Sequence, residues 1–186
     1  VKIDQSQYLD KLVERFIPAN KGSVIKHAMP CNPLTFSQLS TAQTEAERDK
    51  SARLPYLQLI GSLLYLTLTR PDICYYMSIL CSFMHDPSPA CYYAAIDLLL
   101  YILHTRDTHI TFTGSTTVPR GVDVGCQGGV VASGGLLAYT DSSWRRPDRL
   151  GFNSFGYVIY LFGAPVSYMR CCLLYTSPSP RDLAVS

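Results

Sequence analysis

The sequence has no cysteine or histidine pattern of the kind that binds zinc. Its seven cysteines are an odd number, and none forms a C-x-x-C pair or clusters with the four histidines. Zinc sites and thioredoxin-like redox sites need such spacings. We therefore interpret the cysteines as buried thiols that pack like small hydrophobic side chains; Cys74 and Cys81 would share one helix face. This usage indicates a reducing, intracellular compartment, the cytoplasm or the nucleus.

Long apolar runs and strong charge are missing as well. No run reaches the roughly 18 apolar residues that a membrane helix needs, and no secretory signal is visible, so we expect no membrane partner. The net charge of +2 does not by itself indicate nucleic-acid binding. With 47% hydrophobic residues in 186, the composition is typical of a globular protein of one or two small domains.

Apolar periodicity predicts helices in the first half. One covers residues 7–16, after Ser6 as a cap. The next, residues 56–68, is apolar on nearly all sides, and we expect it to be the buried centre of a bundle. Its Gly61 weakens a helix by about 1 kcal/mol relative to alanine, which a close helix crossing would offset. Residues 17–53 are interpreted as a connecting loop with a helical turn at 44–50.

Two more helices follow with clear start signals. Thr69 and Asp72 have the spacing of a capping box, which predicts a helix up to residue 84. Ser88 as a cap and Pro89 in the first turn predict another helix over residues 90–103. The connections are short, so the helices should be antiparallel neighbours.

The second half is typical of β-structure. Residues 113–135 are glycine-rich but lack G-x-x-x-x-G-K-[ST], which favours a flexible linker over a phosphate loop. Strand-like runs at 136–142, 155–162 and 165–169 predict a three-stranded antiparallel meander, marginally stable alone. Residues 110–112 are a further short strand candidate. The expected fold class is α+β, a helical bundle followed by this meander.

Several motifs occur in one order along residues 5–167. P-Y-x-x-L-I-G-S-L-L-Y-L starts at Pro55, R-P-D-I at Arg70, P-S-P-A at Pro87 and Y-T-D at Tyr139. Together they resemble the polyproteins of copia-type LTR retrotransposons, in the segment downstream of the polymerase active site. The resemblance implies that the parent carries out RNA-directed DNA synthesis and ribonuclease H cleavage of RNA–DNA hybrids, both with Mg²⁺.

The resemblance also implies a division of the chain into parts. Residues 1–112 would be a reverse transcriptase thumb and connection segment, and residues 113–135 the linker. Residues 136–170 would be the first strands of a truncated, incomplete ribonuclease H-like fold. Residues 171–186 look like the translation of a sequencing adaptor, and we expect them to be a non-native tail. The polymerase's Y-x-D-D motif would precede Val1, and the rest of the polyprotein would be a partner.

The candidate metal ligand is Asp141. It is the one acid of the family's ribonuclease H cluster that maps onto this chain, and Ser143 stands at a second acidic position. Hydrolysis with two Mg²⁺ ions needs several carboxylates, so we expect an incomplete active site with Asp141 as its remnant. Asp141 can also be an ordinary acid at a strand end. Whether the chain acts as an enzyme stays open at this point.

Candidate nucleic-acid contacts are Arg145, Arg146 and Arg149, which follow Trp144. They would bind the phosphate backbone of an RNA–DNA hybrid weakly, or form a solvated basic turn. The helix at 90–103 has lost the basic residues of the family pattern. Three hypotheses therefore stand: an inactive polyprotein fragment, a non-catalytic nucleic-acid-binding module, and a helical domain that docks a partner.

Overall fold

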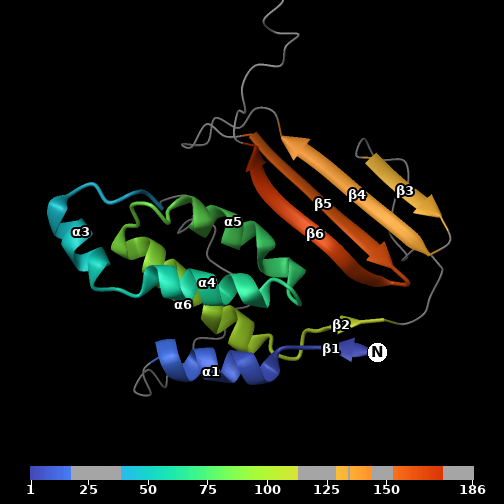
Figure 1. Cartoon of the computed structure of the whole chain (residues 1–186), viewed down its shortest axis with the longest axis horizontal. Helices are drawn as coiled ribbons and strands as arrows, with labels where there is room; N and C mark the ends of the chain where they lie inside the picture. Colours follow the sequence, from blue (N-terminus) through green and yellow to red (C-terminus); the bar gives the residue numbers. More distant parts are fainter. Residues whose placement is uncertain (18–38, 113–128, 134, 144–152, 174–186) are drawn as a thin grey trace, which may run out of the picture. The chain divides into compact units, whose positions relative to one another are not determined.

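The computed structural model describes residues 1–17, 39–112, 129–133, 135–143 and 153–173. The chain divides into two compact units, Val1–Thr111 and Phe112–Ser186 (Figure 1). Each unit is described by itself.

The first unit is a helical bundle closed by a pair of short strands. Its helices are α1 (Ser6–Phe16), α3 (Glu45–Ala52), α4 (Tyr56–Leu66), the 3₁₀ turn η1 (Pro71–Ile73), α5 (Cys74–Ser82) and α6 (Pro89–His104). Strand β1 (Lys2–Ile3) pairs antiparallel with β2 (Ile110–Thr111), which joins the two ends of the unit. The predicted helices are present, including the helical turn at 44–50, which is α3. The short strand predicted at 110–112 is β2.

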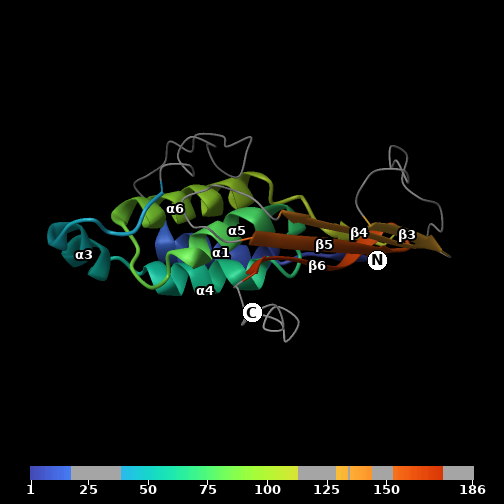
Figure 2. The same ribbon diagram turned by 90° about the horizontal axis from the view of Figure 1, so that it is seen from above.

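Helix α6 is the centre of the bundle. It contacts α1, α3, α4 and α5 (Figures 1 and 2). The fully buried side chains come mostly from α4, α5 and α6, among them Leu59, Ile60, Leu63, Met77, Leu80, Leu98, Leu99 and Ile102. Each such side chain stabilises the fold by about 1.5–3 kcal/mol through removal of its apolar surface from water.

The prediction that the helix at residues 56–68 is the buried centre of the bundle is wrong. One face of α4 packs on the core, but Leu57, Leu64 and Tyr65 are exposed, Leu64 to 42%, and Leu68 beyond the helix end is 63% exposed. Gly61 lies on this open face. A Cβ added there would meet nothing within 4 Å, so no close helix crossing compensates for the glycine in this unit.

The three predicted caps have different outcomes. Ser6 is the first residue of α1, whose N-cap is Gln5. Ser88 occupies the N-cap position of α6 with Pro89 in the first turn, as predicted, but its side chain makes no capping hydrogen bond and lies 3.4 Å from Cys91 Sγ. Thr69 does not cap the next helix: Arg70 is the N-cap residue of η1, and the Thr69 hydroxyl donates to Gln5 Oε1 at 2.7 Å. The capping box fails because the Asp72 carboxylate is bound by the Arg70 side chain, as described below.

The second unit is one antiparallel sheet in the order β3-β4-β5-β6. Its strands are β3 (Gly129–Ser133), β4 (Leu136–Ser143), β5 (Asn153–Leu161) and β6 (Ala164–Leu173). Figure 2 shows it nearly edge-on, as a single layer. The three predicted strands are present. The sheet has a fourth, β3, which lies inside the range predicted to be linker. There the run Gly129-Val130-Val131-Ala132 pairs with β4.

Tight turns fix the register of this sheet. Ser133 pairs with Leu136, and Gly135 in that turn has φ 85°. Leu161 pairs with Ala164 across Phe162 and Gly163, both at positive φ (50° and 83°), the combination that a type I′ hairpin needs. Among the described residues, no helix is long and apolar enough to cross a membrane.

Replacing Gly61 by alanine should stabilise the chain. The helix gains the better propensity of alanine, about 0.5–1 kcal/mol in the free energy of unfolding, and the added methyl group meets only open space. Urea denaturation of the wild type and Gly61→Ala would measure this. A loss of stability would mean that another segment packs closely on this face.

Candidate functional site

The R-P-D motif builds the most extensive polar cluster that is described in the helical unit. The Arg70 side chain is only 4% exposed, and its guanidinium forms a bidentate pair with Asp72. Arg70 Nε donates to Asp72 Oδ1 at 2.9 Å, and Nη2 donates to Oδ2 at 2.7 Å. Such planar, charge-assisted pairs are the strong hydrogen bonds of proteins.

The same guanidinium also holds the end of α6. Arg70 Nη1 donates to the Thr105 carbonyl at 3.1 Å and Nη2 to Thr105 Oγ1 at 2.7 Å, where Thr105 is the C-cap of α6. Tyr101 donates its hydroxyl to Asp72 Oδ2 at 3.0 Å, and its ring lies 5.5 Å from the guanidinium carbon. A cation at a helix C-terminus is favourable because the last carbonyls carry partial negative charge. The Arg70 guanidinium therefore donates its hydrogen bonds to groups inside the fold and is not available to bind a phosphate.

The pairing shifts the titration of Asp72. Burial raises the pKa of its carboxyl, but the hydrogen bonds and charge of Arg70 and the Tyr101 hydroxyl outweigh burial, so the pKa lies below its ordinary value of 3.8. A carboxyl with a lowered folded-state pKa contributes stability above its unfolded pKa, and that stability is lost as the pH falls through the folded pKa. The cluster therefore stabilises the unit at neutral pH and weakens below about pH 4.

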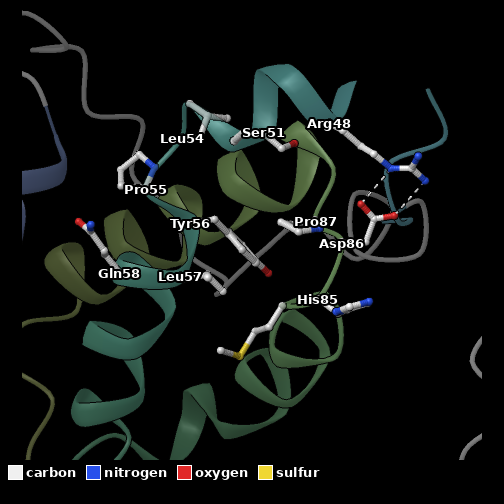
Figure 3. Close-up of a pocket in the computed structure, with 12 residues that line it drawn as sticks. Arg48, Ser51, Leu54, Pro55, Tyr56, Leu57, Gln58, His85, Asp86 and Pro87 are labelled. Carbon is white, nitrogen blue, oxygen red and sulfur yellow. Dashed lines mark hydrogen bonds and ion pairs between the residues drawn. The ribbon is translucent and has the colours of Figure 1, made fainter. Parts of the chain in front are cut away.

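A cavity of about 420 Å³ lies where α3, the start of α4 and residues 84–87 meet (Figure 3). Arg48 Nε lies 3.4 Å from Asp86 Oδ1 at its rim. The Tyr56 hydroxyl donates to the Leu80 carbonyl at 2.7 Å, so this buried group serves the fold. Ser51 Oγ is buried without a hydrogen-bond partner. Ser51 and His85 both line the cavity, but Ser51 Oγ makes no hydrogen bond, so the two do not form a hydrogen-bonded nucleophile–base pair.

The structure places Asp141 on β4 with its side chain exposed. Its partner on β5 is Gly156, which has no side chain, and Gly156 in turn pairs with Arg170 on β6. No second carboxylate stands in this row. Across the described ranges, no three His, Cys, Asp or Glu side chains gather where they could hold a metal ion. The described residues therefore do not fit a pair of Mg²⁺ ions, which needs several carboxylates.

The other candidate site residues lie outside the described part of the chain. Arg145, Arg146 and Arg149 belong to residues 144–152, so their placement relative to Asp141 is not described. Sequence reasoning missed two partners of the R-P-D motif, Tyr101 and Thr105. They are about 30 residues away, and no local spacing connects them to Arg70. It also missed the cavity, which is assembled from two separate stretches of the chain, residues 48–58 and 84–87.

Replacing Arg70 by methionine should lower the free energy of unfolding by about 1–3 kcal/mol, because the partly exposed Asp72 and the half-buried Thr105 carbonyl lose their donor. Arg48→Met is the matched control: Arg48 also pairs with an aspartate, but its side chain is 58% exposed, and an exposed pair contributes about 0–1 kcal/mol. Guanidinium denaturation compares the two. Equal effects would contradict the structural role of Arg70.

Comparison with known proteins gives relatives for nearly the whole chain. It is 24% identical over 185 residues to the retrovirus-related Pol polyprotein from transposon TNT 1-94 of Nicotiana tabacum, covering 94% of the chain but 12% of that polyprotein. It is 31% identical over 115 residues to the Pol polyprotein from transposon RE1 of Arabidopsis thaliana, covering 61% of the chain and 7% of the polyprotein.

A third relative is of a different kind. The chain is 28% identical over 134 residues to the secreted RxLR effector protein 161 of Plasmopara viticola, covering 72% of the chain and 78% of the effector. No family model and no solved structure matches the chain. The predicted resemblance to retrotransposon polyproteins is confirmed: the chain is similar to retrovirus-related Pol polyproteins of plant transposons and spans only a short portion of their length.

Proposed function

We propose that the chain is a non-catalytic, structural part of a copia-type retrotransposon polyprotein. Its helical unit acts as the thumb and connection segment of a reverse transcriptase, and its sheet is the start of a ribonuclease H-like domain. The intact parent copies RNA into DNA and cleaves the RNA strand of the hybrid with Mg²⁺, in the cytoplasm or the nucleus. Similarity to a Pol polyprotein along 94% of the chain carries this proposal.

The geometry of the R-P-D motif supports a structural role for the helical unit. Arg70 and Asp72 neutralise each other, and the remaining donors of Arg70 hold α6. This arrangement stabilises the bundle, and both charged groups of the motif are engaged with each other instead of with a substrate. The partner of such a unit is the rest of the polyprotein.

The sheet supports the non-catalytic part of the proposal. Asp141 is exposed on β4, and its neighbour across the sheet is a glycine. Mg²⁺ binds through carboxylates and water, and cleavage with two metal ions needs a shared set of acids around both. One exposed carboxylate supplies at most a single weak ligand.

Purified chain should therefore not degrade an RNA–DNA hybrid above background in the presence of Mg²⁺. The matched control is Asp141→Asn, which keeps the size of the side chain and removes its charge; we expect wild type and variant to give the same rate. Release of labelled RNA fragments would be followed over hours. Turnover by the wild type that Asp141→Asn abolishes would overturn the proposal.

Nucleic-acid binding is the alternative function, and the distribution of charge favours the second unit for it. Residues 1–111 carry ten basic and ten acidic side chains, whereas residues 112–186 carry six arginines and four aspartates. The net positive charge of the chain thus comes from the second unit, which includes Arg145, Arg146 and Arg149. Backbone contacts of this kind give weak, salt-dependent affinity, about 10⁻⁴–10⁻⁶ M.

If this alternative holds, replacing Arg145, Arg146 and Arg149 together by alanine should abolish a gel shift on an RNA–DNA hybrid. The salt dependence of binding should fall by about 0.7–0.9 in slope for each lost phosphate contact. The control replaces three exposed basic residues of the first unit, Lys11, Lys50 and Arg53, and removes the same charge. Equal losses in both triple variants would indicate non-specific attraction by overall charge and reject the basic turn as the site.

Partner docking by the helices is the other alternative. Its docking surface would be the exposed face of α4, formed by Leu57, Leu64 and Tyr65 around Gly61. Tyr56 is buried and hydrogen-bonded inside the bundle, and the Tyr65 ring packs edge-on against that of Tyr8, with centroids 4.9 Å apart. Specific retention of another polyprotein segment without retention of nucleic acid would support this function.

A further inference from the structure

The cavity between α3, the start of α4 and residues 84–87 has no role in the proposed function. It lies entirely within the helical unit. Its volume of about 420 Å³ falls in the range of about 300–1,000 Å³ that is usual for small-molecule sites. Such sites combine apolar walls with a few polar groups that fix the orientation of the ligand. The cavity has both.

The apolar part of the cavity wall is not fully covered by the rest of the fold. Leu57 is 56% exposed and Met84 is 37% exposed, and both line the cavity. Figure 3 shows Leu57 and Pro55 well away from the charged pair of Arg48 and Asp86, so the wall has an apolar side and a polar side. Because burial of apolar surface is favourable, the apolar side suits an apolar ligand body.

The polar side consists of one loosely made ion pair. Arg48 Nε and Nη2 lie 3.4 Å from Asp86 Oδ1 and Oδ2, respectively. Charge-assisted pairs are normally about 2.7–2.9 Å long, as between Arg70 and Asp72 in the same unit. The Arg48 guanidinium and the Asp86 carboxylate can therefore still donate to and accept from an occupant. Since their charges cancel, a charged occupant would meet a like charge at one of the two groups.

A buried serine in the wall is a further polar group without a partner. Ser51 is 8% exposed, and its hydroxyl makes no hydrogen bond. Buried hydroxyl groups in native proteins are nearly always hydrogen-bonded, because leaving one unpaired is unfavourable. Rotation about one side-chain torsion gives this hydroxyl three staggered positions from which to meet an occupant of the cavity.

We propose that this cavity binds a small uncharged molecule that joins an apolar ring body to an amide group. The amide oxygen accepts a hydrogen bond from the Arg48 guanidinium, and the amide N–H donates to the Asp86 carboxylate. The ring body lies against Leu57 and Met84. An amide suits the polar side because it is neutral and supplies both a donor and an acceptor.

Titration of the ¹⁵N-labelled 186-residue chain with 2-naphthamide, followed by NMR, tests the site. This probe joins two fused rings to one uncharged amide. We expect saturable shifts of the backbone amide signals of residues 48–58 and 84–87, with a dissociation constant of about 1 mM for a probe of this size. Two charged isosteres keep the rings: 2-naphthoate, which only accepts, and 2-naphthamidine, which only donates. Each should bind the wild type about threefold more weakly or worse, since one hydrogen bond is lost.

A pair of arginine variants supplies the second test. Arg48→Met should weaken binding of 2-naphthamide by about threefold or more, because the amide oxygen loses its donor. Arg106→Met is the matched control: Arg106 lies 3.3 Å from Asp10 and is 45% exposed, but neither residue lines the cavity, so this variant should bind like the wild type. Absence of saturable shifts, shifts centred on other residues, a charged isostere that binds as tightly as the amide, or equal losses in the two variants would each overturn the proposal.

Discussion

The helical unit depends on one buried cation. Arg70, in the loop after α4, binds Asp72 two residues on in the turn η1 and Thr105 at the end of α6, 35 residues away. The hydrophobic core supplies most of the driving force for folding, but it is non-directional. The guanidinium adds fixed geometry, because its donors are satisfied only when Asp72 and Thr105 occupy their places. Leaving one of these groups buried without its partner costs more than the pair contributes when made.

Helices and strands were predicted from the sequence more accurately than the contacts that their side chains make. The helices were located by apolar residues that repeat every 3.6 positions and by Pro55, Ser88 and Pro89, which mark helix starts. These signals depend only on residues close together in the sequence. The cap predicted at Thr69 was wrong because Arg70 binds Asp72, the acid of the predicted capping box. Arg70 is itself held by Thr105, which is 35 positions away and could not be foreseen from the local sequence. Strand β3 was missed because it lies in a glycine-rich stretch, and the β4 residues with which Val130 and Val131 pair are not evident from the local sequence.

The candidate site was predictable only in part. Alternation of apolar and polar residues placed Asp141 on a strand, and the structure has it on β4. Which groups stand beside it depends on the register between strands, and a shift of one residue would turn every side chain to the other face. The register brings Gly156 opposite Asp141. The exposed stripe on α4 was hidden for a similar reason, since composition does not tell which side of an apolar helix meets the core.

Pairing of β1 with β2 has a consequence for how the bundle relates to a longer polypeptide. Lys2 lies opposite Thr111, so both ends of the unit leave it at one place. A folded module with adjacent ends tolerates insertion into a host loop and rejoining of its termini at another position. Circular permutation, with new ends opened elsewhere and the old ones joined by a short linker, would thus leave the arrangement of the helices intact.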